Sequence, residues 1–232
     1  MNSSHNSKKI NFDNYANNYE NEISKNLVFF ENDLNYYYIK KVEILKNELR
    51  HDPKNILDFG SGIGALSRHL INKFPKSNIF AHDESKKSLD LLKKNIPKIN
   101  CLYNLNINQK FDLILLSNVI HHVKSSDRNK LFKKLFSLLE TDGILFIFEH
   151  NPYNPITLRI VANCEFDADA ELIKKKELIK ILSNNNFIKI SSGYIHFFPS
   201  NIGFMFKFEK LLKWFFLGAQ YFCMFKKNQT NK

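Results

Sequence analysis

Apolar residues follow two different periods along the chain. Short, mostly apolar runs occupy 55–59, 78–82, 99–103, 111–116 and 143–148. Between them, apolar residues return every three or four positions over 62–73, 85–95 and 127–140, which is the spacing of a helix with one buried face. Strands that are apolar on both faces and alternate with helices predict a parallel sheet covered on both sides. We therefore expect a doubly wound α/β fold.

The segments on either side of this core carry patterns of their own. Phe12, Tyr15 and Tyr19 recur at helical spacing, and residues 36–50 form a second amphipathic pattern that ends at Asp52-Pro53. After a long irregular segment at 149–171 come a predicted helix at 175–184, a strand at 187–198, a Phe-rich helix at about 200–217 and a last strand at 219–225. We expect an N-terminal helical lid over 1–50 and one domain over 51–232 that includes the C-terminal lid helix.

Charge and composition narrow the function only a little. The 232 residues carry 34 Lys and Arg against 23 Asp and Glu, a net charge of +11 that favours an anionic partner. Codon bias explains the surplus equally well. The sequence is rich in Asn, Lys, Ile and Phe, as expected from an AT-rich genome, and such a bias raises the lysine content without selection for an anionic partner. Three scattered cysteines form neither a disulfide framework nor a metal-ligand pattern. With no apolar signal region and no apolar stretch of roughly 18 residues, we expect a cytoplasmic protein.

The sequence ILDFGSGIG joins an apolar strand to a helix through a glycine-rich loop. Gly60, Gly62 and Gly64 allow a tight turn and a close approach of the backbone to a ligand at the helix N-terminus. The spacing of Gly60, Gly62 and Ala65 also fits the dinucleotide fingerprint, so a nicotinamide cofactor such as NAD is an alternative. Asp58 favours a ligand ammonium group, because a carboxylate at that place would repel a pyrophosphate.

Asp83 follows the second strand, about 20 residues beyond the loop. A carboxylate there can accept hydrogen bonds from both hydroxyls of a ribose, which either cofactor would bring. The competing interpretation is a cap on the helix that starts near Ser85. Because the glycine loop precedes it, we predict the ribose contact.

Four segments resemble, in order and spacing, motifs of the class I S-adenosylmethionine-dependent methyltransferases: ILDFGSGIG, AHDES, FDLILLSNVIHHV and TDGILFIFEH. The resemblance implies a mostly parallel, seven-stranded, Rossmann-like sheet and S-adenosylmethionine as cofactor. The stretch CLYNLNINQ lacks the acidic residue with which many relatives contact adenine, and Asn104 is the substitute we consider. The predicted cofactor-binding residues are Asp58, Gly60, Ser61, Gly62, Gly64, Asp83, Glu84, Asn104, Ser117 and Asn118.

Residues just past the fourth and fifth strands are placed to face a methyl group, because ligands bind outside the carboxyl ends of such strands. A neutral acceptor must lose a proton, and histidine is suited to take it. We predict His121 as the base and His122 in a supporting role, with His150 and Glu149 as rivals. We expect no metal ion, because adjacent histidines should diverge and no cysteine cluster accompanies them.

Two Asn-Pro steps follow in EHNPYNPITLRIVANCEFDADAEL. This segment resembles a subgroup of bacterial methyltransferases from surface-glycan, glycolipid and natural-product pathways, which implies an acceptor-facing role for Tyr153, Asn154 and Arg159. The alternative is that the prolines only shape the exit from the sheet. Tyr19 of the lid and Glu149 complete the predicted acceptor residues.

These features predict a methyltransferase for a small molecule, anionic or lipid-linked, with O-methylation preferred because a histidine base is available. The alternatives are an NAD-dependent oxidoreductase, which Asp58 disfavours, and a non-catalytic membrane-associated binding protein. The membrane-associated alternative is based on the Lys and Phe residues of 204–216, which suit peripheral membrane contact. The competing interpretation is that the apolar stripe of this helix packs on the sheet. Dispersed basic residues and the sequence SNVIHH argue against nucleic acid.

Overall fold

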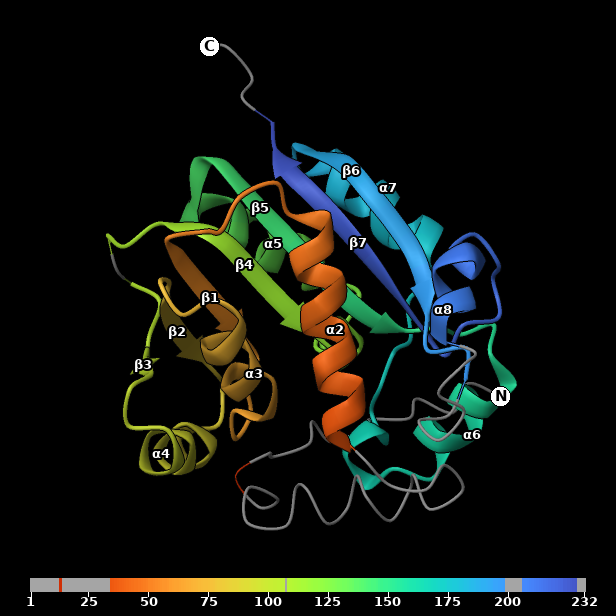
Figure 1. Cartoon of the computed structure of the whole chain (residues 1–232), viewed down its shortest axis with the longest axis horizontal. Helices are drawn as coiled ribbons and strands as arrows, with labels where there is room; N and C mark the ends of the chain where they lie inside the picture. Colours follow the sequence, from red (N-terminus) through yellow and green to blue (C-terminus); the bar gives the residue numbers. More distant parts are fainter. Residues whose placement is uncertain (1–12, 14–33, 107, 199–205, 229–232) are drawn as a thin grey trace, which may run out of the picture.

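The computed structural model describes residues 13, 34–106, 108–198 and 206–228, which form a seven-stranded sheet (Figure 1). The strand order is β3-β2-β1-β4-β5-β7-β6. The strands are β1 (Asn55–Phe59), β2 (Asn78–His82), β3 (Asn100–Cys101), β4 (Phe111–Ser117), β5 (Leu139–His150), β6 (Phe187–Ile195) and β7 (Gln220–Lys227). Strands β1 to β5 pair in parallel, whereas β7 is antiparallel to both of its neighbours. The predicted mostly parallel, seven-stranded sheet is confirmed.

Helices cover both faces of this sheet. They are α2 (Leu34–Glu48), α3 (Ala65–Lys73), α4 (Lys86–Asn95), α5 (Arg128–Leu138), α6 (Pro155–Ala162), α7 (Lys175–Asn184) and α8 (Phe206–Glu209). Three single 3₁₀ turns are η3 (Ile120–His122), η4 (Glu165–Asp167) and η6 (Lys210–Leu212). In Figure 1, α2 crosses in front of the sheet, and α5 and α7 lie behind it. None of the helices in the described ranges is long and apolar enough to cross a membrane.

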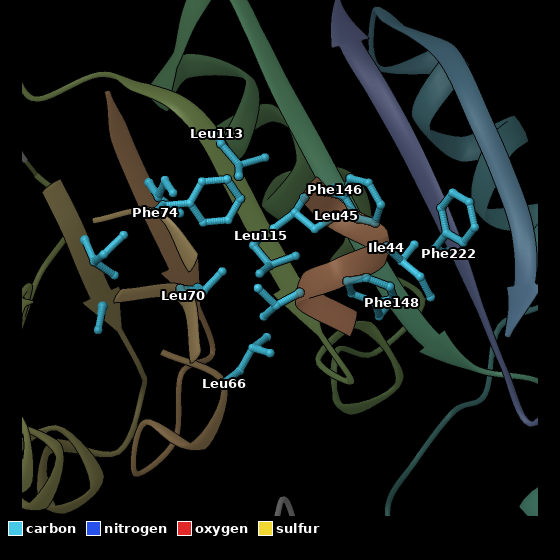
Figure 2. Close-up of a cluster of buried hydrophobic side chains, with 14 of the residues drawn as sticks. Ile44, Leu45, Leu66, Leu70, Phe74, Leu113, Leu115, Phe146, Phe148 and Phe222 are labelled. Carbon is cyan, nitrogen blue, oxygen red and sulfur yellow. The ribbon is translucent and has the colours of Figure 1, made fainter. Parts of the chain in front are cut away.

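The two faces of the sheet bury separate hydrophobic clusters. Leu113 and Leu115 of β4 join the cluster under α2, which Figure 2 shows with Leu45 and Phe146. Ile114, between them in the sequence, joins the cluster on the opposite face. Successive side chains of a strand point to opposite faces, so a strand buried on both sides is apolar at every position. This explains the uninterrupted apolar run from Leu113 to Leu116 in β4.

One edge of the sheet gathers the polar residues that matter for function. The carboxyl ends of the parallel strands β1, β2, β4 and β5 meet there. Strand β7 begins at the same edge, because Gln220 pairs with His150 of β5 and with Ile195 of β6. Side chains from five strands therefore converge on a single border of the sheet.

Several elements differ from the sequence-based expectation. The third strand is only two residues long, and the segment 149–171, expected to be irregular, contains α6 and η4. Residues 206–212 form a short helix and a 3₁₀ turn instead of one continuous helix, and Phe208 and Leu211 of the predicted stripe are 55% and 68% exposed. The expected packing of this apolar stripe on the sheet is therefore wrong at these two positions. Phe12, Tyr15 and Tyr19 lie outside the described residues, and the lid over 1–50 stays a prediction.

Candidate cofactor and acceptor site

The glycine loop between β1 and α3 is held in a conformation that suits glycine. Gly60, Gly62 and Gly64 have φ values of 74°, 54° and 88°. A Cβ on Gly60 would lie 2.4 Å from Cγ2 of Val119, so the close approach to the turn after β4 requires glycine there. A Cβ on Gly62 would meet nothing within 4 Å. The backbone of Gly62 therefore faces open space at the edge of the sheet.

The Asp83 carboxylate ties the end of β2 to the glycine loop. Its Oδ2 accepts a hydrogen bond of 2.8 Å from the Gly62 N–H, and its Oδ1 accepts one of 2.8 Å from the Ser85 N–H. The cap of α4 is Ser85, whose hydroxyl accepts from the Ser88 N–H, so Asp83 is not the helix cap. Burial raises the pKa of Asp83. Each oxygen keeps a free lone-pair direction that can accept from a hydroxyl.

A groove of about 550 Å³ begins at Asp83. It is lined by Asp83, Glu84, Lys86, Leu89, Asp90 and Tyr103. Asn104, considered for the adenine, lies outside this lining, is exposed and accepts a 3.3 Å hydrogen bond from the Asn106 N–H. The groove can hold a flat, partly polar group next to the Asp83 carboxylate.

Asp58 and Ser61 place buried oxygens at the start of the loop. Asp58 is 1% exposed, and its Oδ2 accepts a 2.6 Å hydrogen bond from the Ser67 hydroxyl. Burial raises the pKa of Asp58 to about 6, against the lowering effects of Ser67 and Lys41. The buried Ser61 hydroxyl has no hydrogen-bond partner among the described residues. Both oxygens suit a polar ligand at the carboxyl end of β1.

Asn118 follows β4 in a conformation that is unusual for its residue type. Its φ is 58°, and its backbone N–H donates a 2.9 Å hydrogen bond to the Phe148 carbonyl. The buried Oδ1 has no partner within the described part of the chain. Left-handed backbone and an unpartnered polar atom both cost free energy, and such features gather at binding sites.

Beyond Asn118, six ionisable side chains form the histidine–carboxylate cluster: His121, His122, Glu149, His150, Asp167 and Asp169. Glu149, at the end of β5, fixes the backbone of this cluster and one of its histidines. Its Oε1 accepts from the N–H groups of Val119 and Ile120, at 2.9 and 2.6 Å, and its Oε2 lies 2.6 Å from Nδ1 of His121. Burial acts to raise the pKa of Glu149, but the charge and hydrogen bond of His121 outweigh it and lower that pKa to about 2.

His121 lies between two carboxylates. Its Nδ1 faces Glu149, and its Nε2 is 3.4 Å from Oδ1 of Asp167. Burial alone would lower the pKa of His121, but Glu149 and Asp167 raise it to about 9. Without another cation in the cluster, His121 is therefore an imidazolium at pH 7, a state that cannot take a further proton.

The other two histidines are neutral at the same pH. Burial and the charge of His121 lower the pKa of His122 to about 4 and that of His150 to about 3. The Nε2 of His122 is 3.4 Å from the same Asp167 oxygen that faces His121, and the two rings are 4.1 Å apart. The expectation that adjacent histidines diverge is wrong here, because the 3₁₀ turn η3 brings both rings to one acidic neighbour.

The residues predicted to face the acceptor are distributed differently. Tyr153 is 48% exposed and packs edge-on against Phe216, and Arg159 is exposed on α6. Asn154 is buried: its Oδ1 caps α6 by accepting from the Thr157 N–H at 2.9 Å, and its Nδ2 donates to the Leu217 carbonyl at 2.6 Å. The fold thus uses every polar group of Asn154, and Tyr19 lies outside the described residues.

Comparisons with known proteins identify the fold and the family. Residues 57–145, which contain the glycine loop, Asp83 and the turn after β4, match the family model described as a methyltransferase domain. Residues 57–145 therefore form a methyltransferase domain of the class I S-adenosylmethionine-dependent family. S-adenosylmethionine, in place of NAD, is accordingly the cofactor of this methyltransferase domain.

Curated relatives cover only part of the chain. The methyltransferase is 27% identical over 169 residues to malonyl-[acyl-carrier protein] O-methyltransferase 1 of Ilyobacter polytropus, a match that covers 68% of this chain and 62% of that protein. It is 25% identical over 158 residues to an uncharacterized protein of Rickettsia prowazekii, covering 61% and 63%. The chain thus spans less than two thirds of the length of either relative.

Solved structures share the fold over nearly the whole chain. A methyltransferase from Thermotoga maritima, described as a possible histamine N-methyltransferase, has a TM-score of 0.68 at 17% identity and covers 94% of this chain and 98% of its own. Magnesium protoporphyrin IX methyltransferase from Synechocystis, with bound S-adenosylmethionine, has a TM-score of 0.61 at 13% identity and covers 96% and 100%. At these identities the likeness is one of fold.

Besides Asp169, three residues of this methyltransferase site escaped the sequence analysis. Lys41 of α2 is 3% exposed and donates a 2.8 Å hydrogen bond to the Ser117 hydroxyl. Burial lowers the pKa of Lys41 to about 7, against the attraction of Glu149 and Asp58. Its signal was a lysine on the apolar stripe of the helix predicted at 36–50. Asp167 gave no signal, because nothing local links it to histidines far earlier in the chain.

His196, the third, ends β6 at the same border of the sheet. It is 6% exposed with a φ of 59°, and neither ring nitrogen has a hydrogen-bond partner in the ranges described. Its ring lies edge-on to Tyr37 at 5.1 Å. Burial lowers its pKa well below the ordinary value, so the imidazole is neutral and can offer a donor and an acceptor to a polar molecule.

Proposed function

We propose that this methyltransferase transfers the methyl group of S-adenosylmethionine to a hydroxyl oxygen of a small molecule. The observation that carries the proposal is the position of the histidine–carboxylate cluster. His121 and His122 lie on the turn that begins at Asn118, and Glu149 and His150 end the adjacent strand β5. Proton-accepting groups thus lie directly beside the predicted cofactor residues, as O-methylation requires.

The cofactor would lie along the carboxyl ends of β1, β2 and β4. Its ammonium group would bind near Asp58, and its ribose hydroxyls would donate to Asp83, whose carboxylate is already fixed by two backbone N–H groups. The groove that begins at Asp83 would take the adenine. This arrangement would bring the sulfonium methyl toward Asn118 and the cluster.

The reaction is a displacement at the methyl carbon. The acceptor oxygen forms a bond to that carbon, and the carbon–sulfur bond breaks with its electron pair going to sulfur, which leaves S-adenosylhomocysteine. The hydroxyl proton passes to the cluster, where His121, His122 and His150 are the candidate recipients. The neutral imidazoles of His122 and His150 can take it directly, whereas His121 must first be free of its own proton.

The acceptor belongs, in this proposal, to a glycan, glycolipid or natural-product pathway. The curated relative from Ilyobacter polytropus is named as an O-methyltransferase, which supports oxygen as the methylated atom. The exposed side chains of Leu211, Trp214 and Phe216 suit contact with a lipid-linked acceptor.

The first experiment measures cofactor binding by isothermal titration of the full chain with S-adenosylhomocysteine and, separately, with NADH. We expect micromolar binding of S-adenosylhomocysteine, weakened at least about tenfold by Asp83→Ala because two ribose hydrogen bonds are lost, and no binding of NADH. Asp142→Ala, a change at a surface carboxylate, is the matched control. Equal affinity of wild type and Asp83→Ala for S-adenosylhomocysteine would contradict the ribose assignment, and binding of NADH alone would overturn the function.

The second experiment addresses the acceptor atom. Methyl transfer from labelled S-adenosylmethionine is measured with matched alcohol and amine acceptors, and we expect the alcohols to be methylated. His121→Ala should lower turnover by about a hundredfold while leaving S-adenosylhomocysteine affinity unchanged, with His51→Ala at the exposed surface as control. Turnover of the variant equal to that of wild type would remove His121 from the proposed chemistry.

A further inference from the structure

The two adjacent histidines of the cluster are arranged alike. Nδ1 of His121 lies 2.6 Å from Glu149, and Nδ1 of His122 lies 3.7 Å from Asp169. On the other side of each ring, Nε2 lies 3.4 Å from the same Oδ1 of Asp167. The Nδ1 of each imidazole thus faces a carboxylate, and the Nε2 of each ring faces the same place beside Asp167. Histidines that ligate metal ions are held in this way.

His150 completes this group from the end of β5. One ligand atom each from His121, His150 and Asp167 can be chosen so that all three lie within 4.8 Å of one another. Two atoms bound at about 2.0–2.2 Å to one tetrahedral ion lie about 3.3–3.6 Å apart. The 3.4 Å separations at Asp167 match that spacing.

The charge of the cluster favours a cation in its centre. Glu149, Asp167 and Asp169 have side chains that are only 1%, 11% and 14% exposed. Carboxylates removed from water need nearby positive charge, because their lost hydration costs several kcal/mol each. A divalent ion would supply two positive charges at the point on which the three elements converge.

We propose that His121, His150 and Asp167 bind a divalent first-row transition-metal ion, with His122 as a further ligand and with Glu149 and Asp169 orienting the imidazoles. Two imidazoles and one carboxylate suit Zn²⁺ or Fe²⁺, whereas Mg²⁺ and Ca²⁺ prefer oxygen ligands alone. These four protein ligands would complete a tetrahedral site, so an oxygen of the acceptor would bind as a fifth ligand. That last step rests on the proposed O-methylation, because a bound cation would lower the pKa of the acceptor hydroxyl.

The test is direct metal binding by the untagged full chain after treatment with a chelator. Titration with Zn²⁺ should show one ion per chain, and Co²⁺ should give the visible absorption bands of a nitrogen- and oxygen-ligated site. We expect His150→Gln and Asp167→Asn each to weaken Zn²⁺ binding at least about tenfold, and His51→Gln to leave it unchanged. The proposal would be overturned if the wild type had the same Zn²⁺ affinity as His150→Gln and Asp167→Asn. In that case His121 would remain an imidazolium paired with its neighbouring carboxylates.

Each variant is also titrated with S-adenosylhomocysteine, which reports whether the fold and the cofactor site survive. A variant that has lost its thermal unfolding transition is replaced by Glu149→Gln, which keeps the shape of the side chain and should weaken Zn²⁺ binding about 10–100-fold. An unchanged Zn²⁺ affinity in that variant also counts against the proposal. Zn²⁺ binding without S-adenosylhomocysteine binding would contradict the proposed function alone, and the reverse result would contradict the metal site alone.

Discussion

The cofactor side and the acceptor side of this methyltransferase are built in different ways. On the cofactor side, contacts join residues close in sequence: Asp58 and Ser67 are 9 positions apart, and Gly62 and Asp83 are 21 apart. On the acceptor side, Asn154 and Leu217 are 63 positions apart, and Thr157 and Ala219 are 62 apart. Local motifs therefore determine the first half, whereas the topology of the sheet assembles the second.

The largest expected loss of stability comes from a substitution in the glycine loop. Two alanine substitutions there distinguish a packing contact from a position that faces the ligand. Gly60→Ala forces a Cβ against Val119 at a positive φ, and we expect the free energy of unfolding to fall by about 3 kcal/mol. Gly62→Ala is the matched control: it has the same kind of strain but open space, so its loss should be about 1 kcal/mol while S-adenosylhomocysteine affinity falls. Denaturant unfolding measures both, and equal losses would show that the contact with Val119 is unimportant.

The next comparison is between two helix caps, the cap of α6 on the acceptor side and the cap of α4 on the cofactor side. Asn154→Ala removes the cap of α6 together with the hydrogen bond to the Leu217 carbonyl, and we expect a loss of about 2 kcal/mol. Ser85→Ala removes a cap of α4, with an expected loss of about 1 kcal/mol. If thermal or denaturant unfolding gave the larger loss for Ser85→Ala, the long-range link between α6 and residue 217 would contribute nothing to stability.

After the losses of about 3 and about 2 kcal/mol expected for Gly60→Ala and Asn154→Ala comes a pH dependence of cofactor binding that depends on Asp58. Its raised pKa of about 6 means that the carboxylate is largely ionised at pH 7 and largely neutral at pH 5. The affinity for the ammonium group of S-adenosylhomocysteine should therefore fall about tenfold between pH 7 and pH 5, which corresponds to about 1.4 kcal/mol.

Asp58→Asn tests this assignment by isothermal titration at both pH values. The variant should bind weakly and equally at pH 7 and pH 5, apart from a residual slope from Asp83, whose pKa is also raised by burial. Lys41, the other neighbouring charge, becomes more protonated as the pH falls below about 7 and is retained in both proteins. A wild-type affinity that stays constant over this range would contradict an ionic role for Asp58.

The sequence was sufficient for the parts of the fold that repeat a local period. The runs at β1, β2 and β4 and the helix α7 were predicted within a residue, because burial on a strand or a helix face leaves a regular pattern. The helix α6 was missed, since its Pro155 start and exposed Ile156 and Leu158 hide the usual amphipathic stripe. The continuous helix at 204–216 was wrong because apolar spacing alone does not require burial.

The candidate site divides in the same way. Gly60, Gly62 and Asp83 could be found from their spacing, because a turn between a strand and a helix is a local structure. His121 and His122 could be found but not their state, since the pKa of each depends on Asp167 of a distant turn. Lys41 could have been suspected from its place on an apolar helix stripe, whereas His196 is recognised only once its burial is known.

The strand order also has a consequence for the order of events during synthesis. Strand β7 is translated after every other strand of the sheet, yet it lies between β5 and β6 and pairs with both. Until residues 220–227 leave the ribosome, β6 has no partner in the sheet and the edge of β5 is open. The cofactor side can therefore form on the nascent chain, while Gln220 joins His150 only at the final step.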